Sequence, residues 1–244
     1  MATVTNRLTK PAAKPSQLVE YMANGEMVKI SKDMIKKYLV NGGGAVTDEE
    51  VVMFLNLCRF QHLNPFIREA YLIKYGDRQP ATIVVGKDVF VKRAKASADF
   101  EGVQAGVIVE DEETGNLTER EGTFYQKGVE KLVGGWAKVY IKGYKLPVYA
   151  SVSIDEYIGR KKDGEVNGQW AGKPATMIRK VALMQALREA FPEQNSGLYT
   201  ADEIGGDKEI ALDEAPVVVD EAPAVPDPEQ AEAKSESVAD ALFG

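Results

Sequence analysis

The sequence predicts an α+β fold: a small antiparallel β-sheet flanked by helices, with a long C-terminal core helix and a disordered acidic tail. Capped helical patterns lie on both sides of residues 100–153, where strand-like runs follow one another without a helix between them. Consecutive strands of this kind favour an antiparallel sheet over a doubly wound parallel one. The 244 residues, of which 44% are hydrophobic, suffice for one domain plus tails.

The first expected elements are two helices. Ser31 is placed to cap a short helix through Val40, before three consecutive glycines end it. Thr47 and Glu50 have the spacing of a capping box, which opens a second helix to about His62. One face of this second helix is predicted to hold Val51, Phe54, Leu55 and Cys58.

Strands dominate the middle of the chain. Residues 70–75 and 81–85 read as a hairpin, and a helix is expected over 87–97. A last long helix should begin at Pro174, run to Phe191 and stop at Pro192. The remaining strand-like runs are Val103–Glu110, Leu117–Tyr125, Gly135–Tyr144 and Val148–Ser153.

The formal net charge of −7 is the sum of two opposite parts. Residues 201–244 hold thirteen acidic side chains and two lysines, which leaves a surplus of positive charge in residues 1–200. We therefore expect a flexible N-terminal arm over 1–29, a folded core over 30–204, and a disordered acidic tail over 205–244. The apolar residues 238–243 at the end of this tail fit either a frayed terminus or a docking peptide.

Several classes of protein are excluded. No apolar stretch is long enough to cross a membrane, and residues 1–7 lack the apolar region of a signal peptide, so a cytoplasmic location is expected. Cys58 is the single cysteine, which rules out an internal disulfide or a cysteine-based metal site. There is no phosphate-binding loop of the kind that NTP-driven recombinases require.

Catalysis is not supported either. The only histidine, His62, ends an apolar helix and is read as structural, and Cys58 faces the core. The carboxylates of Glu110–Glu113 precede Gly115-Asn116, which indicates a solvated hairpin tip rather than a metal site. No catalytic residue, metal or cofactor is therefore expected.

The strongest sign of nucleic-acid binding is an alternating strand over 135–144. Ala137, Val139 and Ile141 point one way, suited to a core. The opposite face combines rings that can stack on bases with lysines that can meet phosphates. The alternative is an ordinary exposed face, whose aromatics pack under a neighbouring helix while the lysines extend their charged ends to solvent. The residues of this face are Trp136, Lys138, Tyr140, Lys142 and Tyr144.

Two further basic clusters favour a polyanion-binding groove. One predicted helix carries Lys87, Lys92, Arg93 and Lys95, with Asp88 as its sole acid. The second cluster surrounds Trp170 and comprises Arg160, Lys161, Lys162, Lys173, Arg179 and Lys180.

Cations also lie beside the apolar arc of the last helix, formed by Met177, Val181, Met184 and Phe191. An unpaired charge next to buried surface is costly, so each cation should meet a carboxylate or a ligand phosphate. We expect a structural ion pair for Arg188 and phosphate contacts for Arg179 and Lys180. The start of this helix also offers backbone N–H groups to a phosphate.

Several of these segments resemble the RecT/Bet (Red-beta-like) family of phage single-strand annealing proteins over roughly residues 30–204. The resemblance covers motifs in a specific order, with Trp170 standing four residues before Pro174. Arg179 and Arg188 match basic positions of the family helix. Ala175 and Thr176 stand where the Bet branch is basic, so the Thr176 hydroxyl or Lys173 would replace that charge. The matching segments are Leu63-Asn64-Pro65-Phe66, Glu69-Ala70-Tyr71, Val84-Val85-Gly86, Met177-Ile178-Arg179-Lys180 and Ala190-Phe191.

The resemblance implies ATP-independent binding and annealing of single-stranded DNA in phage-type homologous recombination. It also implies oligomeric rings or helical filaments that hold single-stranded DNA and the annealed duplex. A phage exonuclease or a host single-strand-binding protein would bind the C-terminal region. The residues expected to contact DNA are Lys74, Lys87, Lys92, Arg93, Trp136, Lys138, Lys142, Trp170, Lys173, Thr176, Arg179, Lys180 and Arg188.

The sequence leaves three alternatives open. A passive coating protein would bind single strands without pairing them. A metal-dependent nuclease would need acidic groups converging from separate strands, and none is singled out. A self-assembling scaffold would have no role on DNA.

Overall fold

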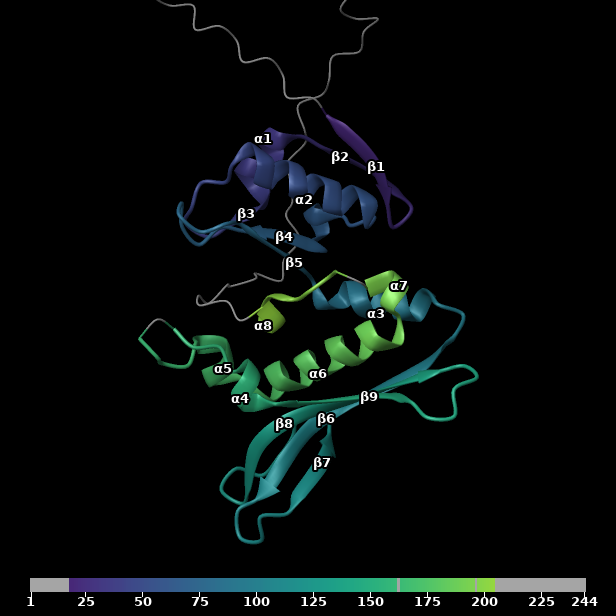
Figure 1. Ribbon diagram of the computed structural model, residues 1–244, viewed down its shortest axis with the longest axis vertical. Coiled ribbons are helices and arrows are strands. Elements are labelled where there is room, and N and C mark those ends of the chain that lie inside the picture. The colour runs from purple at the N-terminus through teal and green to yellow at the C-terminus, as the bar shows by residue number, and fades with distance from the viewer. Residues whose placement is uncertain (1–17, 162, 196, 205–244) are drawn as a thin grey trace, which may run out of the picture.

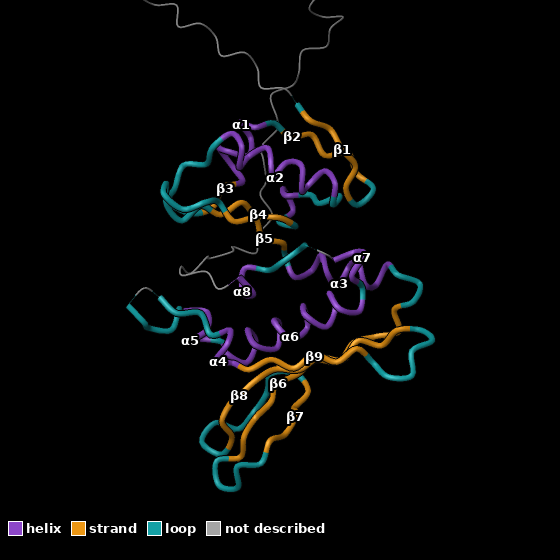
Figure 2. The backbone as a smooth tube through the Cα atoms, viewed as in Figure 1, coloured by secondary structure: helices purple, strands orange, loops and turns teal. Residues whose placement is uncertain are grey.

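The computed structural model describes residues 18–161, 163–195 and 197–204. Figures 1 and 2 show three layers: an N-terminal lobe of small sheets and one long helix, a middle layer of helices, and a β-sheet beneath them. The α+β fold with antiparallel sheets is confirmed. The predicted acidic tail over 205–244 lies outside the described residues.

The N-terminal lobe begins with a hairpin that the sequence analysis did not predict. β1 (Val19–Ala23) pairs antiparallel with β2 (Glu26–Ile30). Asn24 and Gly25 both have positive φ, as a two-residue type I′ turn requires. The Tyr21 hydroxyl donates to the Leu63 carbonyl at 2.8 Å, which ties the hairpin to the lobe.

The expected flexible arm over 1–29 is therefore corrected for its second part, because the residues from Val19 onward form a strand pair packed on the core. Residues 1–17 lie outside the described part of the chain. An Asn-Gly turn between short alternating runs was the available sequence signal. Its alternating residues Tyr21, Ala23, Val28 and Ile30 are buried.

The two predicted helices of this lobe are present. Ser31 caps α1 (Lys32–Met34), which continues as the π-helix η1 (Ile35–Leu39). α2 (Asp48–Phe60) begins with the predicted capping box, in which both reciprocal bonds between Thr47 and Glu50 are formed. The predicted apolar face is buried and consists of Val51, Phe54, Leu55 and Cys58.

A three-stranded sheet closes the lobe. β3 (Val40–Asn41) pairs parallel with β4 (Ala70–Ile73), and β5 (Thr82–Val85) completes the predicted hairpin with β4. The 3-10 helix η2 (Pro65–Ile67) leads into β4. A Cβ at Gly42 would lie 2.3 Å from the Lys74 carbonyl oxygen, so the glycine run permits this close approach.

The second sheet has the order β7-β6-β8-β9 and is antiparallel throughout. All four strands lie where the sequence predicted them, but some of their ends differ. The strand that begins at Leu117 ends at Glu121 rather than Tyr125. The strand predicted over 135–144 begins at Glu130 and ends at Ile141, before the Gly143 turn. The bounds of the four strands are β6 (Phe100–Asp111), β7 (Leu117–Glu121), β8 (Glu130–Ile141) and β9 (Val148–Ser153).

Helix α6 (Pro174–Ala190) crosses one face of this sheet (Figure 1), and its predicted apolar arc is buried. α3 (Lys87–Ala96) packs against α6. α6 ends before Pro192, as predicted, and Pro192 then begins a short further helix. The short helices around α6 are α4 (Ile154–Tyr157), α5 (Gly168–Gly172), α7 (Pro192–Asn195) and α8 (Ala201–Ile204).

The other face of the sheet carries no helix in the part of the chain that the structure describes (Figure 1). None of the described helices combines the length and apolar character needed to cross a membrane.

Candidate nucleic-acid interface

Lys74 is a structural cation rather than a surface one. Its side chain is 3% exposed and its Nζ lies 2.6 Å from Glu50 Oε1. The same carboxylate accepts from the backbone N–H groups of Thr47 and Ala81. The ammonium group, followed by these N–H donors, lowers the pKa of Glu50 to about 2. A DNA contact requires an exposed side chain, so the burial of Lys74 contradicts its predicted role as such a contact.

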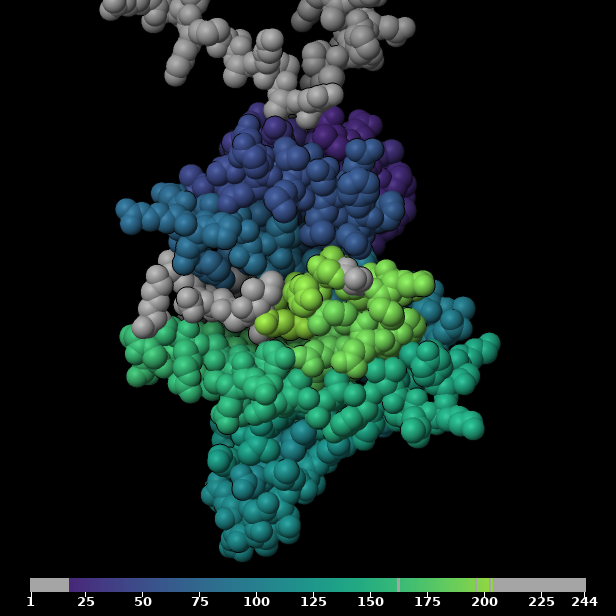
Figure 3. Space-filling view, viewed as in Figure 1, coloured from purple at the N-terminus to yellow at the C-terminus, as the bar shows by residue number. Residues whose placement is uncertain are grey.

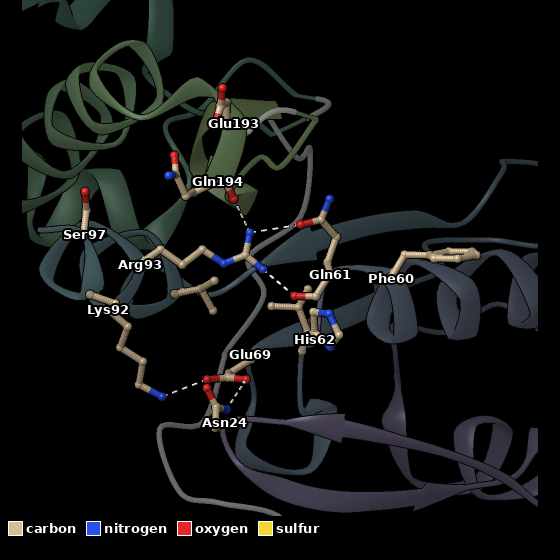
Figure 4. Close-up of a pocket in the computed structure, with 13 residues that line it drawn as sticks. Asn24, Phe60, Gln61, His62, Glu69, Lys92, Arg93, Ser97, Glu193 and Gln194 are labelled. Carbon is tan, nitrogen blue, oxygen red and sulfur yellow. Dashed lines mark hydrogen bonds and ion pairs between the residues drawn. The ribbon is translucent and has the colours of Figure 1, made fainter. Parts of the chain in front are cut away.

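Lys92 and Arg93 belong to what we call the interlobe joint: Asn24, Gln61, Glu69, Lys92, Arg93 and Gln194. These residues line a pocket of about 410 Å³ where the N-terminal lobe meets α3 and α7 (Figure 4).

In this joint, Glu69 accepts from three donors at once. Lys92 Nζ and Asn24 Nδ2 each lie 2.8 Å from its carboxylate oxygens, and the Asn64 N–H lies at 2.9 Å. Burial opposes ionisation of Glu69, but these hydrogen bonds outweigh it and hold its pKa below the usual range.

The Arg93 guanidinium is also occupied. It donates to the Gln61 side chain at 3.0 Å, to the Gln61 carbonyl at 2.5 Å and to the Gln194 carbonyl. Both predicted DNA contacts on this part of α3 therefore hold the lobe to the helical layer. His62, read as structural, accordingly has its Nδ1 3.0 Å from the Met22 carbonyl oxygen, although its ring is exposed.

Both tryptophans are buried, which contradicts their expected role as platforms for bases. Trp170 is 2% exposed, and its ring fills the space where a Cβ on Gly159 would lie. Trp136 is 5% exposed, lies over Gly106 and donates from Nε1 to the Arg120 carbonyl at 3.3 Å. Their large apolar rings do more for packing than the sequence pattern indicated.

The predicted alternation of β8 is confirmed, since Ala137, Val139 and Ile141 are buried. Lys138 lies on the opposite face of the sheet, where its Nζ is 2.8 Å from Glu119 and 4.5 Å from the centroid of the Trp136 ring. The Tyr149 hydroxyl donates to the other oxygen of Glu119, also at 2.8 Å. On this outer face Lys138 is therefore already paired within the sheet, and no described helix covers its aromatic side chains as the alternative interpretation expected.

The cations of α6 divide into two kinds. Arg188 Nη2 lies 2.5 Å from Glu203, and its guanidinium stacks 4.5 Å from the Tyr199 ring centroid, so the expected structural ion pair is confirmed. Arg179 is half-buried and donates from Nε to the Ala105 carbonyl at 3.1 Å. Neither arginine is presented as an open phosphate contact.

The start of α6 is different. Lys173 and Thr176 are exposed and Lys180 is half-buried. Their spacing of three and four residues places them on one side of the helix. No side chain caps this end, and Pro174 occupies its first turn, so no described side-chain acceptor meets the N–H groups of Ala175 and Thr176.

A neighbouring loop adds two exposed cations, Arg160 and Lys161. The loop is closed by a bridge between Arg160 and Val166 and by a bond from the Asn167 N–H to the Gly159 carbonyl at 2.9 Å. Asn167 also caps α5, which packs on α6. Trp170 therefore positions this loop next to the start of α6, and the loop reaches the surface at that end of the helical layer (Figures 1 and 3).

We refer to Arg160, Lys161, Lys173, Thr176 and Lys180 as the α6 basic surface. The segment 160–180 contains six basic and two acidic residues. Among the described residues, no carboxylate forms an ion pair with Lys161 or Lys173. Lys87 at the start of α3 and Lys142 in the turn after β8 are exposed as well, but they lie on other elements.

Arg160 and Lys161 belong to the second predicted basic cluster but are not among the predicted DNA contacts. The signal was their position ahead of the Trp170 anchor, which could not be recognised until the ring was known to be buried.

The acidic residues do not form a metal site in the residues that the structure describes, where no group of three potential ligands is found. Asp111 is engaged at the predicted hairpin tip, because its Oδ1 accepts from the Glu113 and Thr114 N–H groups and the Thr114 hydroxyl. The Thr114 and Glu113 bonds lower the pKa of Asp111.

An α+β core with an exposed cationic helix start defines a candidate polyanion-binding protein. The family model described as the RecT family matches residues 25–218, and the chain belongs to this family. The resemblance noted in the sequence is thereby confirmed, and with it a role in phage-type recombination by binding and annealing single-stranded DNA. A search of curated proteins finds no match.

Proposed function

We propose that the protein anneals complementary DNA strands without nucleotide hydrolysis, and that the α6 basic surface holds the phosphates of the first strand. The observation that carries this proposal is a contrast between cations: Lys161 and Lys173 are exposed and pair with no described carboxylate, while Arg188, toward the end of the helix that Lys173 precedes, is paired. Exposed lysines of this kind are available to replace the counterions of a polyanion.

The proposed mechanism is physical rather than chemical. Neutralising the phosphates lowers the repulsion between two approaching strands. The backbone N–H groups at the uncapped start of α6 supply further anion contacts. The bases stay exposed, so correct pairing with a second strand supplies the free energy that selects homology. A downhill reaction of this kind requires no cofactor.

Assembly on DNA is part of the proposal. The hairpin β1–β2 exposes Met22 and Met27, which face each other across the two strands, and Phe60 at the end of α2 is 75% exposed. Exposed apolar side chains gathered in one lobe mark an interaction surface. We assign protomer contacts in rings or filaments to this lobe, so the DNA-binding and oligomerisation core expected over 30–204 is extended to include the hairpin β1–β2.

The setting of the activity follows from the same proposal. An exonuclease or a single-strand-binding protein is the expected partner of the C-terminal region, and the bacterial cytoplasm is the expected location. The annealed duplex is held as the product.

The test is an annealing assay on the full chain and on Lys161→Gln and Lys173→Gln, singly and together. Each substitution should weaken oligonucleotide binding at about 50 mM salt by several-fold and lower the slope of log affinity against log salt by about 0.7 for each phosphate that is no longer neutralised. Lys131→Gln is the matched control, because Lys131 is an exposed lysine on β8 in the acidic half of the sheet. Equal binding and annealing by all variants would refute the assigned surface.

The same assays separate the alternatives. A passive coating protein would bind oligonucleotides with the predicted salt dependence but would not accelerate duplex formation. A nuclease would shorten labelled DNA in the presence of magnesium, and a scaffold would show no shift of DNA at any salt concentration.

A further inference from the structure

Residues 205–244 are strongly acidic, whereas the α6 basic surface is cationic. They contain eleven carboxylates and two lysines. The segment 160–180 has the opposite sign, with six basic and two acidic residues. Carboxylates and phosphates are recognised by the same ammonium and guanidinium groups.

The described chain places the start of this acidic segment close to α6. Helix α8, which ends at Ile204, contacts α6, and Glu203 pairs with Arg188 at 2.5 Å. From Arg188 back to Lys173 the helix rises by about 22 Å. About seven extended residues cover that distance, and residues 205–244 supply many more.

We propose that the acidic segment 205–244 docks on the α6 basic surface of its own chain and competes there with single-stranded DNA. The proposal rests on the proposed function for the role of that surface. Because the segment is tethered, its effective concentration at the surface is on the order of millimolar, so individually weak contacts suffice to occupy it. DNA displaces the segment because its phosphates are more densely charged.

Such competition sets a minimum length of single-stranded DNA that the protein binds well. An isolated short stretch of DNA replaces few of the tail contacts, whereas a long single strand engages several protomers at once. Both interactions are screened by salt, so the effect of the tail on DNA binding should fade as ionic strength rises.

The main experiment changes charge without shortening the chain. In the tail variant, Asp220 and Asp227 become Asn, and Glu221 and Glu229 become Gln; all four lie beyond the residues matched by the family model. In the control variant, four exposed glutamates of the second sheet and its turns become Gln, which alters the net charge by the same amount. These are Glu101, Glu112, Glu113 and Glu121.

At about 50 mM salt the tail variant should bind a 30-nucleotide strand about three- to tenfold more tightly than the unmodified chain, and the difference should fall below twofold near 0.5 M. The control variant should stay within about twofold throughout. Equal affinities of the tail variant and the unmodified chain at low salt would overturn the proposal. Equal strengthening in both variants would overturn it as well, because net charge alone would then be the cause.

A second measurement does not depend on DNA affinity. A carbodiimide joins ammonium and carboxylate groups in direct contact, so it should link Lys161 or Lys173 to acidic residues of 205–244 in the absence of DNA, and an added oligonucleotide should suppress these links. In an equal mixture of light and heavy chains, mixed links in the proportion expected for contacts between copies would overturn the proposal. Links only to lysines outside the α6 basic surface would overturn it as well.

The two proposals fail in different ways. If Lys161→Gln and Lys173→Gln leave DNA binding unchanged, the DNA role of the surface is wrong, whatever the tail does. If those substitutions weaken DNA binding but the tail variant matches the unmodified chain, the surface stands and the docking of the tail is wrong.

Discussion

The interlobe joint and the α6 basic surface are built from the same residue types and differ in what meets each cation. In the joint, Lys92 faces Glu69 at 2.8 Å, and Arg93 is occupied by two main-chain carbonyls and a side-chain amide. On the α6 basic surface, Lys161 and Lys173 are exposed and no described carboxylate pairs with them.

This difference shows that a cation of this sequence stabilises the fold wherever an acceptor of low exposure lies beside it. Glu69, 6% exposed, and Glu50, 17% exposed, are the acceptors that capture Lys92 and Lys74. No described residue supplies such an acceptor to Lys173 at the start of α6. Substitutions should therefore affect folding at the first kind of site and binding at the second.

The largest effect is expected from Lys74→Met. It leaves the Glu50 carboxylate, which is 17% exposed, without its cation, which should lower the free energy of unfolding by about 1.5–3 kcal/mol. Urea denaturation measures this, with the exposed Lys87→Met as the matched control, which should stay within about 0.5 kcal/mol. A loss below about 1 kcal/mol for Lys74→Met would show that the buried pair does not stabilise the lobe.

A change of pH should test the same Lys74–Glu50 pair, because acid protonates the Glu50 carboxylate. The pKa of Glu50 is lowered from 4.5 to about 2, so its contribution is fully present above about pH 4.5 and is lost as the pH falls toward 2. The stability difference between the unmodified chain and Glu50→Gln should therefore shrink over that window. An identical difference at pH 7 and pH 3 would contradict the assigned pair.

A crossed pair of substitutions tests the comparison directly. Lys92→Gln should lower the free energy of unfolding by about 1 kcal/mol, because Glu69 loses one of its donors, and should leave DNA affinity unchanged. Lys173→Gln should leave stability within about 0.5 kcal/mol and weaken single-strand binding several-fold. If both variants lose DNA affinity equally, the two regions do not differ in the way proposed.

The smallest effect is expected on the outer face of the sheet. Lys138 is already paired with Glu119, so Lys138→Met should change DNA affinity by less than about twofold and stability by at most about 1 kcal/mol. Oligonucleotide binding and urea denaturation check the two values. A fivefold or greater loss of affinity would instead mark this face as a second DNA-binding surface.

Local signals predicted most of the fold. The capping box at Thr47, the proline at the start of α6 and the alternation in β8 each specify an element within a few residues of sequence. The hairpin β1–β2 was missed because its strands are only five residues long each and follow a segment rich in proline and threonine.

The candidate site was less predictable, because contacts with residues distant in sequence decide whether a charged or aromatic side chain is buried or exposed. Lys74 is captured by a carboxylate 24 residues away, and Trp136 bonds a carbonyl 16 residues away. For Arg188 the sequence supported two roles: its place inside the apolar arc of its helix required a counter-charge, and the ion pair with Glu203 is present, whereas its expected DNA contact is not supported.

Cys58 makes the molecule convenient for spectroscopy. It is the only cysteine of the chain and is fully buried, and burial, the leading cause, raises the pKa of its thiol to about 12. Thiol reagents act on the thiolate, so this sulfur should stay unlabelled in the folded protein. A cysteine introduced at the exposed Ser151 or Ser153 on the outer face of the sheet would then be the sole attachment point for a fluorophore, and energy transfer between labelled copies could follow their assembly along DNA in real time.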